Sequence, residues 1–140
     1  MLDCTIKVYT EQGYDSHKDC GEEVFRGTLC KKNNHVFVIY KEQDQESKLE
    51  ITNQIKVSKD GTVSVRRRGH TQSVLHFTEG TPYTTFYNTG HGAMELIFIP
   101  TVVRYEDQAH TYKIELRYAI HMGEEKLSDN VYILEARPLA

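Results

Sequence analysis

The stretch KLEITNQIKVSKDGTVSVRRRG, residues Lys48–Gly69, contains the strongest indication of how this chain folds. Apolar and polar residues alternate on both sides of Asp60-Gly61, with the period of a β-strand whose side chains point to opposite faces. An Asp-Gly pair between two such runs is a strong signal for a β-hairpin. The stretch therefore predicts two antiparallel strands joined by a tight turn.

The same alternation continues toward both ends of the chain, interrupted only by turn-forming segments such as EGTP, NTGHG and EDQ. No segment shows the pattern of a long amphipathic helix, although a short helical turn is expected within Glu11–Glu23. In all, we expect about nine or ten strands. Outside the hairpin, the predicted strands are Leu2–Thr10, Glu22–Lys32, His35–Glu42, Ser73–Phe77, Thr81–Asn88, Ala93–Glu106, His110–His121 and Asn130–Leu139.

Many consecutive strands joined by short turns predict an antiparallel meander that curls on itself. Closing such a meander into an up-and-down β-barrel removes its exposed edges, and a small barrel can hold side chains or one small ligand inside. A β-sandwich is the alternative architecture. The length of 140 residues favours a single domain over residues 1–140.

Composition limits the function classes that fit. Seventeen basic and 20 acidic residues give a net charge of −3, which argues against nucleic-acid or anionic-membrane binding by overall charge. The chain has three cysteines and no CxxC pair, and its first residues include charged side chains and alternate between apolar and polar. We therefore expect free thiols and a cytoplasmic location. No apolar run has the length of a membrane span, so we expect no membrane partner.

Six short motifs, in this order and spacing, carry a resemblance to a known family. They are YKE (Tyr40–Glu42), VSVRRRG (Val63–Gly69), LHFTEG (Leu75–Gly80), FYNTGHG (Phe86–Gly92), IPT (Ile99–Thr101) and LRYAI (Leu116–Ile120). The chain resembles the YwiB-like family of small uncharacterised bacterial proteins over nearly its whole length. The resemblance implies an all-β fold, a single calycin-like (lipocalin-like) barrel of about 8–10 strands, and supplies no activity, cofactor or catalytic residue. The arginine that ends one strand of the family's pattern corresponds to Arg67.

Strand parity divides the three consecutive arginines between two faces. Arg67 shares a face with Val63 and Val65, so we expect it to point into the barrel. A desolvated guanidinium requires a partner, and Glu42, at the end of the apolar face of its own strand, is the predicted one. The candidate residues of this interior site are Glu42, Arg67, Tyr118, Tyr40, Tyr87 and Thr101.

Two interpretations of this interior cluster stay open. It could be the polar floor of an apolar cavity that orients a small hydrophobic, amphipathic or anionic ligand. It could equally be a structural ion pair that closes the barrel and fixes strand register. The outward residues form a separate candidate, a basic strand face that could contact phosphates: Lys56, Lys59, Arg66 and Arg68.

No nucleophile signature, P-loop or metal-ligand spacing occurs, so the sequence favours a protein without catalytic residues, metal or cofactor. The leading hypothesis is a non-enzymatic cytoplasmic barrel that binds a small hydrophobic or amphipathic ligand inside. The alternatives are a structural or protein-interaction module without a small ligand, which includes association with a second copy of the chain, and weak nucleic-acid binding through the basic strand face.

Overall fold

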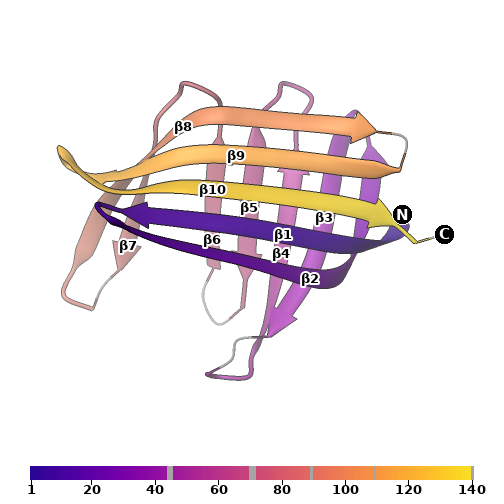
Figure 1. Ribbon diagram of the computed structural model, residues 1–140, viewed down its shortest axis with the longest axis horizontal. Coiled ribbons are helices and arrows are strands. Elements are labelled where there is room, and N and C mark those ends of the chain that lie inside the picture. The colour runs from indigo at the N-terminus through magenta and orange to yellow at the C-terminus, as the bar shows by residue number, and fades with distance from the viewer. Residues whose placement is uncertain (44–45, 70–71, 89, 109, 140) are drawn as a thin grey trace.

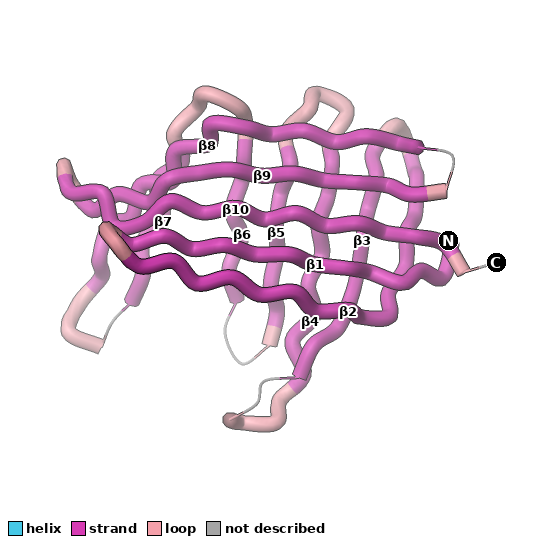
Figure 2. Tube along the Cα trace, in the orientation of Figure 1, coloured by secondary structure: helices cyan, strands magenta, loops and turns pink. Residues whose placement is uncertain are grey.

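The computed structural model describes residues 1–43, 46–69, 72–88, 90–108 and 110–139, and of residues 87 and 88 only the backbone. All regular structure in these ranges is β-strand, with short connections between the strands (Figure 2). The strands are β1 (Leu2–Tyr14), β2 (His17–Lys32), β3 (His35–Gln43), β4 (Glu50–Val57), β5 (Val63–Arg68), β6 (Gln72–Phe77), β7 (Tyr83–Asn88), β8 (Ala93–Gln108), β9 (Thr111–Met122) and β10 (Glu125–Pro138).

The ten strands form one antiparallel sheet in the order β6-β5-β4-β3-β2-β1-β10-β9-β8-β7. Neighbouring strands in sequence pair from β1 to β6 and from β7 to β10, and β1 additionally pairs with β10. The two end strands, β6 and β7, are joined by a connection that contains an isolated bridge between Thr78 and Thr81. The result is a nearly closed up-and-down barrel, which confirms the predicted all-β barrel and is consistent with a calycin-like fold.

The barrel is flattened into two layers whose strands cross steeply. In Figure 1, β8, β9, β10, β1 and β2 run across the front, and β3–β7 run behind them in a different direction. Two long strands join the layers: β2 pairs with β1 and then with β3, and β8 pairs with β7 and then with β9. Strands that pass from one sheet to the other in this way make the corners of orthogonal packings.

A glycine marks the corner in β2. Gly27 pairs with Cys4 on one side and Tyr40 on the other, at the point where β2 leaves β1 and joins β3. A Cβ atom at this position would lie 2.4 Å from the carbonyl oxygen of Ile39 and 2.8 Å from the side chain of Ile6. The absence of a side chain at residue 27 thus lets the two backbones approach closely at the bend.

The predicted hairpin in Lys48–Gly69 is present as β4 and β5. Val57 pairs with Val63, and the connecting turn is closed by hydrogen bonds from the backbone N–H of Ser58 to the carbonyl of Thr62 and from Gly61 to Ser58, both 2.9 Å. Gly61 has a φ of +92°, which an L-residue adopts only with strain. The turn that the Asp60-Gly61 pair predicted is therefore confirmed.

The expectation of a helical turn within Glu11–Glu23 is wrong. Residues on both sides of Asp15-Ser16 belong to β1 and β2, which pair from Tyr14–His17 down to Leu2–Leu29. Asp15 has a φ of +43° and allows a two-residue hairpin connection. Pairing along both long strands outweighs the weak local preference of this polar segment, because each residue added to the ladder gains cross-strand contacts.

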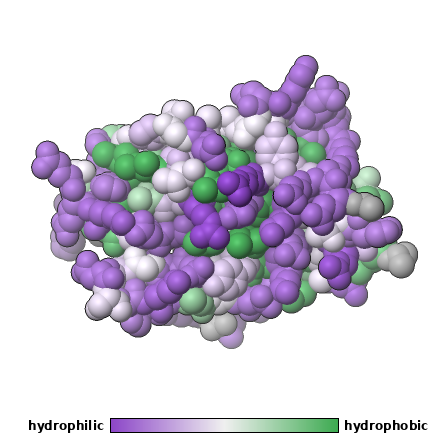
Figure 3. All heavy atoms as spheres, turned by 45° about the horizontal axis from the view of Figure 1, so that its top comes forward, coloured by the Kyte–Doolittle hydropathy of each residue, from purple (hydrophilic) through white to green (hydrophobic). Residues whose placement is uncertain are grey.

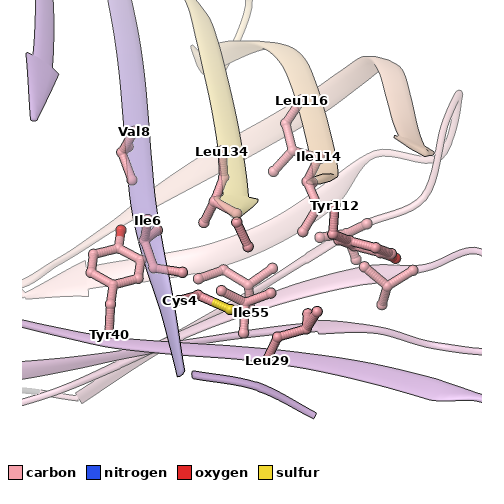
Figure 4. Close-up of a cluster of buried hydrophobic side chains, with 14 of the residues drawn as sticks. Cys4, Ile6, Val8, Leu29, Tyr40, Ile55, Tyr112, Ile114, Leu116 and Leu134 are labelled. Atoms are coloured by element: carbon pink, nitrogen blue, oxygen red, sulfur yellow. The ribbon is translucent and has the colours of Figure 1, made fainter. Parts of the chain in front are cut away.

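The interior is filled unevenly along the barrel. We call the filled end the packed half; Figure 4 shows several of its side chains converging from both layers. We call the other end the open half, where the inward residues of the same strands surround a cavity. The packed half consists of Cys4, Ile6, Leu29, Val38, Ile55, Val57, Val63, Ile114, Leu134 and Ala136, all at most 5% exposed.

Candidate ligand site in the open half of the barrel

A cavity of about 340 Å³ occupies the open half. This volume lies at the lower end of the range of about 300–1,000 Å³ that small-molecule sites occupy. Its walls combine aliphatic and aromatic side chains with a few polar groups, most of them on β3, β4 and β5. The lining residues are Val8, Thr10, Gly21, Glu23, Phe25, Tyr40, Glu42, Asn53, Val65, Arg67, Leu75, Phe77, Leu116, Tyr118 and Tyr132.

The polar side of the cavity comes from adjacent positions on three neighbouring strands. Tyr40 of β3 pairs with Asn53 of β4, which pairs with Arg67 of β5. Glu42 lies two residues beyond Tyr40 and so points to the same face. Alternation along each strand therefore directs all four side chains into the barrel, where they line the cavity.

Glu42, Asn53 and Arg67 form a closed ring of hydrogen bonds, which we call the rim triad. Arg67 donates from Nη2 to Glu42 Oε1 at 2.8 Å and from Nε to Asn53 Oδ1 at 3.1 Å. Asn53 donates from Nδ2 to the same Glu42 oxygen at 2.9 Å. The predicted pairing of Arg67 with Glu42 is confirmed, and the inward direction of Arg67 follows the parity of its strand.

Asn53 was not among the sequence candidates, although a signal for it existed. It stands between Ile51 and Ile55 in the alternation of its strand, so it is a polar residue on an otherwise apolar face. It is only 3% exposed, and buried amides are hydrogen-bonded in nearly all proteins. A polar residue at an inward position is therefore the signal that would have indicated a third partner for the ion pair.

The expectation that Arg67 is desolvated in the interior is wrong. Its side chain is 49% exposed, and that of Glu42 is 26% exposed. The short strand β5 ends one residue later at Arg68, so Arg67 lies at the open rim of the barrel with water on one side. The ion pair consequently lies where an entering molecule would meet it. It does not form a buried floor.

The phenols deeper in the cavity are neutral hydrogen-bonding groups. Tyr40 and Tyr132 share a hydrogen bond of 3.1 Å between their hydroxyl oxygens. Burial raises the pKa of Tyr40, and burial together with the neighbouring phenol raises the pKa of Tyr132 well above its usual value. Burial likewise raises the pKa of Tyr118. These three side chains therefore offer O–H groups without adding charge to the cavity.

Aromatic rings make up much of the remaining wall. The ring of Phe25 stacks on Tyr40 at a centroid distance of 4.8 Å, and Phe77 contacts Tyr118 at 5.0 Å. Such pairs hold each other in place and add to the free energy that burial provides. Together with Leu75 these rings give the cavity much of its apolar surface.

One predicted site residue, Thr101, is not part of this arrangement. Thr101 is exposed, donates its hydroxyl to the carbonyl of Arg117 at 3.1 Å, and does not line the cavity. It is the extra residue of a β-bulge, because Pro100 pairs with Tyr118 and Val102 with Arg117. Thr101 thus lies on the opposite face of β8 from the buried residues Phe98 and Pro100. The side chain of Tyr87 lies outside the described residues.

The four residues of the predicted basic face lie away from the cavity. Arg66 and Arg68 alternate with Arg67 and are exposed on the outer surface of the rear layer. Lys56 of β4 lies on the same outer face, and Lys59 follows the end of that strand. The division of the three arginines between two faces is thus confirmed.

The fold and the cavity define a class of small antiparallel β-barrels that are packed at one end and hollow at the other. Residues 6–134 match the family model described as "Domain of unknown function (DUF1934)", and the chain belongs to this family. The crystal structure of the ywiB protein from Bacillus subtilis superposes with a TM-score of 0.83 at 20% sequence identity, covering 99% of this chain and 93% of that one. The resemblance to the YwiB-like family is therefore confirmed.

Among curated proteins, no match to this chain was found. Within the described residues there is no helix long and apolar enough to cross a membrane.

Proposed function

We propose that this protein binds a small hydrophobic or amphipathic molecule in the open half of its barrel and does so without catalysing a reaction. The observation that carries the proposal is the cavity of about 340 Å³, whose lining combines apolar and aromatic side chains with a few polar groups. Binding sites for small molecules are mostly of this kind, because apolar walls supply affinity and a few polar groups fix orientation.

The distribution of the lining residues gives the orientation of the ligand. Its apolar part would lie against Leu75, Phe77 and Leu116, which line the cavity. Its polar group would lie near Arg67 and Glu42, which remain partly exposed to water. This arrangement would leave the polar group hydrated at the mouth while the apolar part loses contact with water.

The chemistry of the wall favours binding over catalysis. No Cys, His or Ser is found among the fifteen lining residues that the structure describes. Glu42 already accepts hydrogen bonds from Asn53 and Arg67, and the tyrosine hydroxyls stay protonated at neutral pH. An activated nucleophile with an adjacent base, the usual signature of covalent catalysis, is therefore not formed by these residues.

A cytoplasmic location is part of the proposal. It rests on the three cysteines, all of which are free thiols: Cys4 is buried, Cys30 is half-buried and Cys20 is exposed. Free thiols, one of them on the surface, fit a reducing compartment.

Native mass spectrometry of the protein purified from its own host tests the proposal directly. We expect a mass above that of the bare chain, which mild activation removes as a small molecule. A matched pair of variants then locates the ligand: Leu75→Trp fills the cavity, whereas Val74→Trp places the same ring on the outer face of the same strand. We expect Leu75→Trp alone to abolish the added mass.

The same pair can be tested with the fluorescent probe 1-anilinonaphthalene-8-sulfonate, which binds exposed apolar surface. Binding by the wild type and Val74→Trp, but not by Leu75→Trp, would support a cavity site. A bare chain in the native spectrum together with equal probe binding by both variants would refute the proposal and leave the rim triad as a structural element that fixes strand register.

A further inference from the structure

The outer face of the rear layer carries cations that the cavity does not use. Outward side chains of β3, β4, β5 and β6 form three rows of four across this face, which we call the basic face. None of these twelve residues is acidic, although the whole chain has a net charge of −3. The rows are Phe37-Lys56-Ser64-His76, Ile39-Gln54-Arg66-Val74 and Lys41-Thr52-Arg68-Gln72.

Most of these cations have no carboxylate partner. Lys41 pairs with Glu50 at 3.3 Å. In the parts of the chain that the structure describes, none of the ion pairs includes Lys56, Arg66 or Arg68, and Lys59 beside them also forms none. The net charge therefore averages over surfaces of opposite character, and the prediction drawn from it does not apply to this face.

The outer face of the front layer, in contrast, carries charges that form ion pairs. There, cations and carboxylates alternate and pair, with Lys7–Glu22 at 3.6 Å and Arg117–Glu115 at 2.6 Å. Viewed from the front and top, hydrophilic residues cover most of the surface (Figure 3). Paired charges of this kind keep a strand surface hydrated and leave little field to attract a polyanion.

Aromatic rings lie among the unpaired cations of the basic face. The ammonium group of Lys56 lies 5.8 Å from the ring centroid of Phe37. At the other side of the face, the ring of His76 stacks on Tyr83 with a centroid distance of 5.4 Å. Phe37 and Tyr83 are both half-buried, and Tyr83 also packs against the core and donates its hydroxyl to the carbonyl of Val74 at 3.3 Å.

We propose that the basic face binds single-stranded nucleic acid. Arg66 and Arg68 can each hold a phosphate with a two-pronged guanidinium, and Lys56 and Lys59 add point charges beside them. Rings interleaved with cations distinguish this surface from one that binds only charge, because aromatic faces stack on any base while the cations follow the backbone. The site lies on the opposite side of the sheet from the cavity and does not depend on the ligand proposed for it.

Fluorescence anisotropy with a labelled oligouridine of about 12 nucleotides tests this directly, since sites on small β-barrels span about 4–16 nucleotides. Four phosphate contacts predict that the logarithm of the association constant falls with the logarithm of the salt concentration with a slope of about −3. We expect measurable binding at low salt with such a slope. Binding of an oligothymidine of equal length would equally support the site, because stacking and phosphate contacts do not require the 2′-hydroxyl.

A charge-reversal pair locates the surface. The double variant Arg66→Glu/Arg68→Glu changes two exposed positions, and we expect its affinity to fall about ten-fold or more at low salt. The matched control, Arg104→Glu/Arg137→Glu, makes the same change in net charge on the outer face of the front layer. We expect the control to bind nearly as the wild type does, with thermal unfolding showing that both variants are folded.

Three outcomes would overturn the proposal. The first is an absence of oligonucleotide binding at low salt. The second is an equal loss in both double variants, which would indicate only a response to net charge. The third is retention by vesicles rich in anionic lipid without binding of either oligonucleotide, which would assign the basic face to a membrane surface.

Discussion

The two halves of the barrel interior are built from the same ten strands but are filled differently. In the packed half, Ile6, Ile55 and Ile114 are fully buried and come from both layers. A few residues along these strands, the inward positions hold Asn53, Glu42 and other residues around a cavity. Because burial of apolar side chains is concentrated in the packed half, we expect this half to contribute more to stability than the half around the cavity.

Among the variants that test this comparison, the largest loss of stability is expected in the packed half. Ile114→Ala removes a fully buried side chain from a filled interior and should lower the free energy of unfolding by about 2–5 kcal/mol. Urea denaturation measures this value, and Glu106→Ala, an exposed position on β8, is the control. A loss below about 1 kcal/mol would mean that the packed half is not the main source of stability.

The corner in β2, where this strand passes from one layer to the other, should be the next most sensitive position. Gly27→Ala places a methyl group 2.4 Å from the carbonyl oxygen of Ile39, which forces the β2 corner to open and should cost about 1–3 kcal/mol. Gly21→Ala is the matched control on the same strand, because its nearest contact would be an ordinary 3.7 Å to Thr10. Equal unfolding midpoints for the two variants would show that the corner tolerates a side chain.

In the open half, replacing Asn53, the buried member of the rim triad, should lower the free energy of unfolding more than replacing Arg67, the exposed member. Asn53→Ala removes a buried amide that bonds both Arg67 and Glu42, and should cost about 1–2 kcal/mol. Arg67→Met keeps most of the side-chain stem and breaks a half-exposed ion pair, which should cost at most about 1 kcal/mol. If Arg67→Met proved the more damaging in thermal unfolding, the triad would have to be regarded as a buried structural pair.

At neutral pH, the smallest effect on stability is expected from the phenols of Tyr40 and Tyr132. Because burial raises the pKa of Tyr40 and Tyr132 above the unfolded value of about 10, the folded state holds these protons more tightly. Their contribution to stability is complete below pH 10 or so and is lost as pH rises through the folded pKa values. Alkaline unfolding followed by tyrosinate absorbance should therefore begin later in Tyr132→Phe than in the wild type, and an identical profile would contradict this.

Much of the fold followed from local patterns in the sequence. The Asp60-Gly61 turn and the alternation around it predicted β4 and β5, and parity alone predicted that Arg67 points inward and Arg66 and Arg68 outward. The Glu42–Arg67 pair was also predicted, because a guanidinium on an inward face requires a carboxylate. These features depend on neighbours along one strand or on simple charge pairing, so a single sequence contains them.

The errors came from positions where one strand's pattern is altered by its neighbours. Thr101 was named for the interior site, but it is the extra residue of a bulge against β9 and is exposed. The polar segment around Asp15 forms a hairpin because β1 and β2 pair along their whole length. No local signal distinguishes these cases, because the deciding contacts come from other strands.

The sequence by itself determined the strands, the face of each side chain and the partner of Arg67, because alternation and charge pairing act over a few residues. The tertiary structure decided which half of the interior is filled, how exposed the rim triad is, and that Lys56, Arg66 and Arg68 gather on one surface. Burial and surface charge depend on how strands distant in the sequence lie together, and this arrangement exists only once the barrel has formed.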